Sequence, residues 1–241
     1  MSKLYEALEN ASREREKLEM AKTRMVPPPA LPRWESDMEM MGLHQAMDAA
    51  LDRKTNRVVQ FIGTQEGEGC STIVRNLAGT AAVKLDESVL LLDLDPRPSF
   101  NDLTTDATFH YHLETLSIQA TPLDNAFRQT ETGNLTISTF SLKSDPILAL
   151  LDMSHDDSLW DRLREQFSLI LIDAPPAASS HMGFSLLGRC DGVVLVVRAE
   201  KTRWPEAMDV KEKIVRGGGK VLGAVYNDRR HYVPGWLRKY V

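Results

Sequence analysis

The sequence predicts a doubly wound α/β fold built on a mostly parallel sheet. From residue 57 onward, short apolar runs alternate with segments of helical length and pattern. The runs are almost continuously apolar, which is typical of strands buried on both faces by covering helices. Strands are expected at 57–63, 88–92, 134–140, 169–172, 192–197 and 220–225, and helices at 38–51, 71–85, 159–167 and 205–215.

Composition excludes several classes of protein. The 241 residues are 42% hydrophobic and 26% charged, which is enough for a packed core and excludes disorder throughout. The net charge of −5 argues against nucleic acid as a partner. The two cysteines, Cys70 and Cys190, argue against a disulfide scaffold and indicate a reducing compartment.

The sequence also predicts a cytoplasmic location. No apolar run approaches the ~18–20 residues that a membrane-spanning helix needs. The first ten residues carry charge and lack an apolar core, which argues against a secretory signal. Peripheral attachment at the inner membrane, through a partner or the C-terminal tail, is left open.

Three parts are expected along the chain. Residues 1–22 have the composition of a helical arm, either an exposed charged helix or a docking helix for a partner or a second copy. Residues 23–37 contain four prolines and predict an extended linker. Residues 38–241 are expected to form the globular domain. Met40, Leu43, Met47 and Leu51 share one face of its first helix.

A glycine-rich loop, GTQEGEGCST, occupies residues 63–72 between the first expected strand and a helix. Glycines let backbone N–H groups approach phosphate oxygens, and the helix N-terminus adds positive potential, so the loop predicts a phosphate site. In the pattern G-x-x-x-x-G-K-[ST], Thr64 replaces the first glycine, Cys70 replaces the lysine, and Ser71 keeps a hydroxyl for magnesium. A glycine-rich turn without a ligand is the alternative.

Acidic residues follow two other expected strands. Asp93 and Asp95 end the segment LLLDLDPR, and Asp173 ends the strand in LILIDAPP. Because ligands of such sheets bind outside the carboxyl ends of the strands, these carboxylates are expected beside the glycine-rich loop. An apolar strand ending in aspartate is typical of a magnesium-holding carboxylate, whereas Asp-Pro by itself also signals a turn.

In this order, GTQEGEGCST, LLLDLDPR and LILIDAPP resemble the bacterial tyrosine autokinases of capsule and exopolysaccharide assembly, within the MinD/ParA-like P-loop ATPases. The opening MSKLYEALENA and the closing KVLGAVYNDRRHYVPGWLRKYV extend the resemblance. It implies a P-loop NTPase fold and a role in exopolysaccharide biosynthesis of the capsule or holdfast type, in chain-length control or export. The implied partner is a membrane polysaccharide copolymerase or export component, and a homo-oligomer is left open.

The resemblance also implies ATP or ADP with Mg as the ligand, and it assigns roles by position. Asp93 and Asp95 would help to activate the nucleophile, and Ser71, Asp93 and Asp173 would surround the metal. The residues that would contact the nucleotide are Gly67, Glu68, Gly69, Cys70, Ser71, Thr72 and, near the base, Asn227.

Three departures from the family pattern bear on activity. Cys70 removes the lysine whose ammonium contacts the phosphates, a contact worth about 10²–10³ or more in rate. The last ten residues hold only Tyr232 and Tyr240, where the family has a tyrosine cluster. His44 stands near the position where the family's assembly motif has an arginine.

The sequence therefore favours a regulatory protein with weak or absent catalysis. The alternative is an active ATPase or protein-tyrosine autokinase, in which Arg75 or Arg97 replaces the missing cation. A third candidate is a ParA/MinD-like partitioning ATPase. The basic and aromatic tail, residues 229–240, suits a membrane interface, an acidic partner, or packing against the domain itself.

Overall fold

The computed structural model describes residues 37–51, 55–95, 127–130, 133–139 and 146–229. The expected arm, nearly all of the linker, and the tail from residue 230 lie outside the described residues. Arg97, the alternative replacement for the missing cation, also lies outside them.

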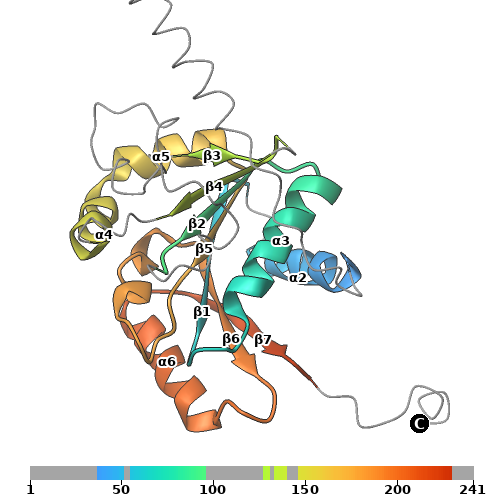
Figure 1. The fold of residues 1–241 in the computed structure, drawn as a ribbon. Helices are drawn as coiled ribbons and strands as arrows, with labels where there is room; N and C mark the ends of the chain where they lie inside the picture. Colours follow the sequence, from blue (N-terminus) through green and yellow to red (C-terminus); the bar gives the residue numbers. More distant parts are fainter. Residues whose placement is uncertain (1–36, 52–54, 96–126, 131–132, 140–145, 230–241) are drawn as a thin grey trace, which may run out of the picture.

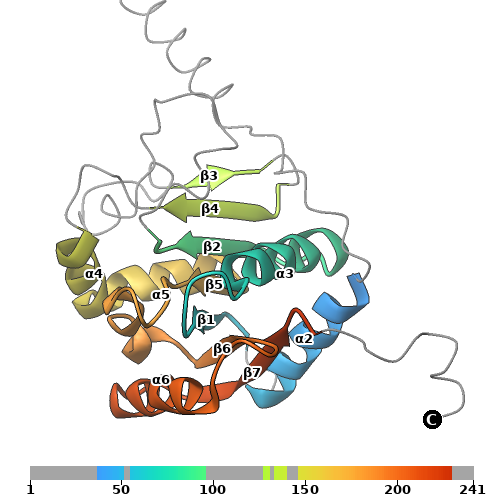
Figure 2. The same cartoon turned by 60° about the horizontal axis from the view of Figure 1, so that its bottom comes forward.

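A seven-stranded sheet forms the centre of the fold, in the order β3-β4-β2-β5-β1-β6-β7 (Figure 2). Six strands are parallel, and the two-residue β3 pairs antiparallel with β4 at one edge. This arrangement confirms the predicted doubly wound sheet. The strands are β1 (Arg57–Gly63), β2 (Val89–Asp93), β3 (Arg128–Gln129), β4 (Leu135–Thr139), β5 (Leu169–Asp173), β6 (Gly192–Arg198) and β7 (Val221–Asn227).

Helices cover both faces of the sheet (Figure 1). One face carries α2 (Asp37–Ala50) and α3 (Cys70–Lys84). The opposite face carries α4 (Pro146–His155), α5 (Asp157–Gln166) and α6 (Trp204–Arg216). The short 3₁₀ turns η4 (Met182–Phe184) and η5 (Leu187–Arg189) precede β6. Within the part of the chain described, no helix is both long and apolar enough to cross a bilayer.

The expected elements agree with this structure to within about two residues at each end. Among the α-helices and strands of the described residues, β3 and α4 were not predicted from the sequence. The strand β3 has only two residues, too few for a hydrophobic period. The helix α4 reads PILALLDMSH, and a short apolar run of that length does not distinguish a strand from a buried helix.

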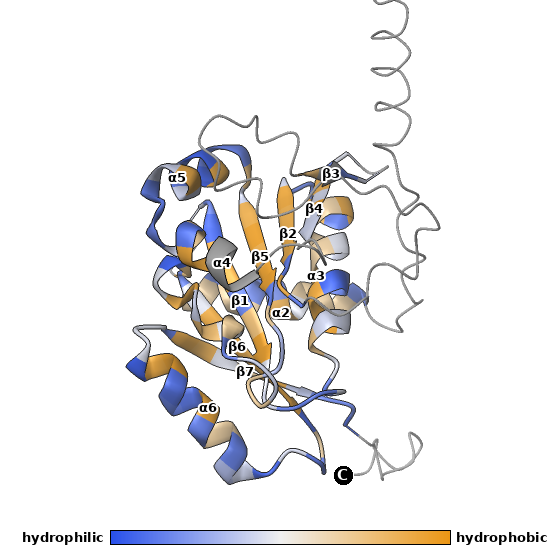
Figure 3. Cartoon of the chain, turned by 60° about the vertical axis from the view of Figure 1, so that its left-hand side comes forward, coloured by the Kyte–Doolittle hydropathy of each residue, from blue (hydrophilic) through white to orange (hydrophobic). Residues whose placement is uncertain are grey.

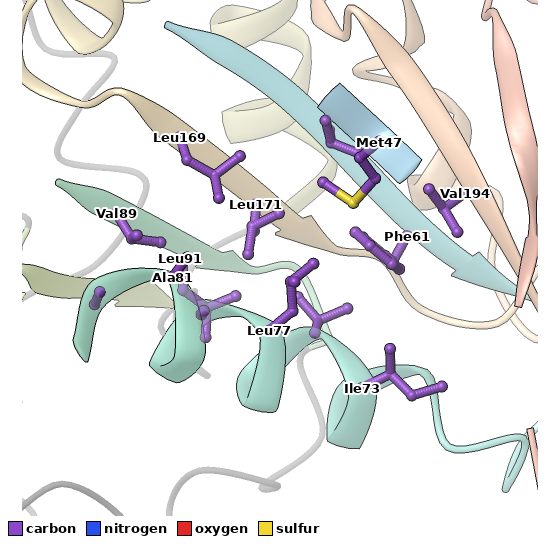
Figure 4. Packing of buried hydrophobic residues seen from close by; sticks show 14 of the residues in the cluster. Met47, Phe61, Ile73, Leu77, Ala81, Val89, Leu91, Leu169, Leu171 and Val194 are labelled. Atoms are coloured by element: carbon purple, nitrogen blue, oxygen red, sulfur yellow. The ribbon is translucent and has the colours of Figure 1, made fainter. Parts of the chain in front are cut away.

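Alternate residues of each central strand enter different cores. Val59 and Phe61 of β1 pack toward α2 and α3, whereas Val58 packs toward α4 and α5. Figure 4 shows Met47, Leu77 and Phe61 meeting between the helices and the sheet. This two-sided burial explains the continuous apolar strands, which contrast with the amphipathic α6 in Figure 3.

A buried polar network ties α2 to the start of the sheet. The side chain of Arg57 lies 2.7 Å from His44 Nε2, 3.0 Å from Glu87 and 2.9 Å from Asp48. Burial would raise the pKa of Glu87, but the adjacent His44 and the charge of Arg57 outweigh it and lower the pKa. His44 therefore faces inward, 6% exposed, and positions α2 within the domain.

Replacing Met47 with alanine should lower the free energy of unfolding by about 2–4 kcal/mol, because its side chain is 2% exposed in the α2–α3 core. Met38→Ala on the same helix is the matched control. Met38 is 82% exposed, so the change should stay within about 0.5 kcal/mol. Denaturant unfolding followed by circular dichroism measures both, and equal effects would contradict the observed docking of α2.

Candidate functional site

The carboxyl ends of β1, β2 and β5 meet at one edge of the sheet. β2 pairs with β5 in a register that sets Asp93 opposite Asp173. β1 pairs with β5 on the other side, with Phe61 opposite Asp173. The glycine-rich loop that leaves β1 therefore begins beside both carboxylates, as expected from the sequence.

The loop has the backbone conformation of an anion-binding cradle. Gly67 and Gly69 have φ angles of 76° and 86°, in the left-handed region that glycine adopts without strain. α3 begins at Cys70, and the first amides of an α-helix, here those of Cys70, Ser71 and Thr72, have no acceptor inside the helix. These amides and the helix dipole favour an anion at this position.

Glu68 supports the loop from inside the protein. Its buried carboxylate accepts hydrogen bonds from the N–H groups of Thr64 and Gln65 and from the hydroxyls of Thr64 and Thr202. The Glu68 side chain therefore holds the shape of the loop. Only the backbone of Glu68 forms part of the anion-binding cradle.

Two residues from β6 and β7 hold the other side of the loop. Asn227 Nδ2 donates to the Glu68 carbonyl oxygen at 2.8 Å, and Arg198 Nη1 donates to the Gly67 carbonyl oxygen at 3.3 Å. A Cβ added to Gly69 would lie only 2.2 Å from Asn227 Nδ2. The end of β7 therefore packs directly on the loop, and position 69 has no room for a side chain.

Asp93 is 2% exposed. Its Oδ1 accepts the N–H of Asp95 at 3.0 Å, and Arg75 Nη2 lies 3.4 Å from its Oδ2. Burial, and then the charge of Asp173, raise the pKa of Asp93 to about 7 against the opposing effects of the Asp95 N–H and Arg75. Burial beside Asp173 therefore disfavours the ionised form of Asp93.

Asp173 is 1% exposed, and within the described residues neither of its carboxylate oxygens has a hydrogen-bond partner. Burial raises its pKa to about 6, opposed by the nearby Ser71 hydroxyl and the charge of Arg75. An orphaned buried carboxylate beside a second carboxylate and a hydroxyl is an oxygen donor set that fits a magnesium ion. The structure places Ser71 and Asp93 beside Asp173, and their role as metal ligands stays a prediction.

Cys70 lies at the first position of α3, and its thiol faces the same carboxylates. Burial, and then the neighbouring charges of Asp173, Glu68 and Asp93, raise the pKa of the Cys70 thiol well above its ordinary value. The thiol is neutral at physiological pH and contributes no positive charge to the cradle.

Several contacts to the loop were not found by sequence reasoning, and those of Thr202 and Arg198 are two of them. Thr202 bonds to Glu68 across 134 positions of sequence, and Arg198 bonds to Gly67 across 131. Neither residue carries a local motif, because only the pairing of β6 with β1 brings them near the loop.

No family model matches the chain. It is 27% identical over 177 residues to the putative tyrosine-protein kinase CapB of Staphylococcus aureus, covering 71% of this chain and 76% of CapB. It is 27% identical over 175 residues to the tyrosine-protein kinase CpsD of Streptococcus agalactiae, covering 72% of this chain and 76% of CpsD. Its homologues are bacterial tyrosine-protein kinases.

Solved structures agree with this kinase homology at the level of the fold. The kinase domain of Escherichia coli tyrosine kinase ETK has a TM-score of 0.72 at 17% identity, covering 88% of this chain and 86% of that one. The chimerical protein CapA2B2 has a TM-score of 0.71 at 21% identity, covering 86% and 93%. MinD of Pyrococcus horikoshii, complexed with Mg-ADP, has a TM-score of 0.57 at 18% identity, covering 76% of each chain. The kinase homologue thus has the P-loop NTPase fold.

Gly69→Ala should destabilise this kinase homologue by about 1–3 kcal/mol more than Gly67→Ala. Both positions have a positive φ, so both substitutions carry backbone strain of about 1–2 kcal/mol. Only the methyl group at position 69 meets Asn227, because nothing lies within 4 Å of a Cβ at position 67. Denaturant unfolding measures the difference, and adding Asn227→Ala should recover part of it. Equal losses for the two glycine variants would show that β7 does not restrict the loop.

Asp173→Asn should stabilise the metal-free protein. The pKa of Asp173 is raised to about 6, above an unfolded value of about 3.9, so the ionised carboxylate destabilises the fold at high pH. The gain should reach about 1–3 kcal/mol at pH 8. It should shrink as the pH falls through about 6, where the folded carboxyl becomes protonated, and vanish only below about 3.9, where the unfolded carboxyl is protonated too. Unfolding in EDTA at pH 8 and pH 4.5 measures it. A gain that is the same at both pH values would contradict a buried ionised Asp173.

Proposed function

We propose that the chain is a nucleotide-binding member of an exopolysaccharide assembly system, with weak or absent phosphoryl transfer. Three structural features support nucleotide binding: the left-handed glycines, the amides at the start of α3, and the carboxylate pair beside them. The phosphates of ATP or ADP would lie on the loop, and Ser71, Asp93 and Asp173 would hold magnesium. Bound magnesium would supply positive charge that offsets the negative charge of the phosphates.

The neutral thiol of Cys70 is the observation that carries the regulatory part of the proposal. A lysine at this position would extend an ammonium to the β- and γ-phosphates, where it stabilises transition-state charge. The Cys70 thiol has a raised pKa and stays uncharged. The cradle keeps its backbone donors without the lysine, so binding is retained while phosphoryl transfer loses about 10²–10³ in rate.

The biological setting is proposed from the homologues and the sequence. The homologues are tyrosine-protein kinases, and one similar solved structure is of a chimerical protein. Together with the resemblance of the sequence, the kinase homologues support docking on a membrane polysaccharide copolymerase or export component. The proposed role is control of chain length or export. The chain would reach the inner membrane through that partner or through its basic and aromatic tail.

An active ATPase or tyrosine autokinase is the second candidate, and Arg75 favours it. Its guanidinium lies 3.4 Å from Asp93 and brings a positive charge into the site without the lysine. Magnesium-ATP turnover by the wild-type protein distinguishes the two candidates. Turnover that is lost in Asp93→Ala would contradict the regulatory proposal.

Cys70→Lys should bind ADP with magnesium about tenfold more tightly than wild type, because the new ammonium adds charge-assisted contacts to the phosphates. Isothermal titration calorimetry with Mg-ADP measures the affinity. Cys70→Ser is the matched control and should stay within about threefold of wild type, since a hydroxyl is neutral like the thiol. If wild type and Cys70→Lys both fail to bind ADP or ATP, the loop is a turn without a ligand.

A further inference from the structure

Arg75 brings a positive charge into a site that lacks the lysine of the P-loop pattern. It lies four residues after Ser71, so the two side chains share one face of α3. Side chains on an α-helix lean toward its N-terminus, which directs the guanidinium of Arg75 back toward the loop. Its Nη2 atom lies 3.4 Å from Asp93 Oδ2, and the side chain is 20% exposed.

The carboxylates that Arg75 faces form an incomplete site. Asp93 and Asp173 are adjacent in the β2–β5 register and almost fully buried, at 2% and 1% exposure. Both oxygens of Asp173 are without a hydrogen-bond partner at bonding distance in the described structure. The nearby Ser71 hydroxyl and Cys70 thiol only partly offset the burial that raises the pKa of Asp173, so the carboxylate can still accept a cation. Two buried carboxylates this close need compensating positive charge, from a metal ion or from a side chain.

We propose that Arg75 is a built-in competitor for the divalent cation at Asp93 and Asp173. Its guanidinium already engages one of the two carboxylates that magnesium would use. Magnesium binding requires free carboxylate oxygens in near-octahedral geometry, and a cation a few ångströms away repels it. The site therefore holds a divalent ion weakly while Arg75 pairs with Asp93, and it becomes a strong site when the guanidinium is displaced from that carboxylate.

This role goes beyond a substitute for the missing lysine. A lysine at position 70 would act on the phosphates and leave the carboxylates free for the metal, whereas Arg75 acts on the carboxylates themselves. A polyphosphate is the ligand class that would draw the guanidinium away, because an arginine fork binds phosphate oxygens bidentately. The inference rests on the proposed function, in which this edge is the nucleotide and metal site.

Manganese alone tests the proposal, since Mn²⁺ takes the ligands of Mg²⁺ and its free form is counted by electron paramagnetic resonance. Arg75→Gln should bind Mn²⁺ at least about tenfold more tightly than wild type, because the competing charge is gone. Arg75→Met keeps the apolar stem and should show the same gain if the glutamine variant folds poorly. Arg216→Gln, on an exposed turn of α6, is the matched control and should leave the affinity unchanged.

Combining Arg75→Gln with Asp173→Asn should abolish the gain, which assigns the bound ion to the acidic pair. Unchanged Mn²⁺ affinity in both Arg75 variants would overturn the proposal, as would a gain that persists without Asp173. The measurement uses no nucleotide. Failure of wild type to bind ADP would therefore count against the proposed function, whereas equal Mn²⁺ affinities would count against the role of Arg75.

Discussion

The parallel pairing of β2 with β5 sets two carboxylates, Asp93 and Asp173, side by side at the end of a fully buried sheet. Burial and their mutual proximity disfavour the ionised forms, and the pKa values rise to about 7 and about 6. A protein that only needed stability would replace them with apolar residues, because an uncompensated buried charge lowers the free energy of unfolding. Their presence at the mouth of the glycine-rich loop supports the proposal that this edge of the sheet receives a cation.

The loop keeps its shape through residues that follow β1, follow β6 and end β7. Glu68 fills the inside of the turn, Thr202 after β6 bonds to Glu68, and Asn227 at the end of β7 fixes its carbonyl oxygen. Position 69 is left with no room for a side chain. The cradle is thus preformed by packing that is independent of position 70. This explains physically how a cradle without the lysine keeps its shape.

The positive charge of this site stands at a different residue from the one in the general P-loop pattern. The position of the lysine carries a neutral thiol in Cys70, and a guanidinium enters five residues later, at Arg75. This cation faces the carboxylate of Asp93. The arrangement supports the proposed function, in which phosphate binding is retained and the metal is held weakly.

The sequence by itself determined that the sheet is mostly parallel, where its long strands lie along the chain, and which strands end in aspartate. It could do so because strands buried on both faces are continuously apolar and glycines mark the loop. The order of the strands within the sheet came from the structure. The sequence also located Cys70 at the lysine position. Only the tertiary structure showed that Arg75 faces Asp93, that His44 turns inward to Arg57, and that Thr202 and Asn227 contact the loop. These contacts join residues from separate elements, and only β-strand register and helix packing bring such residues within bonding distance.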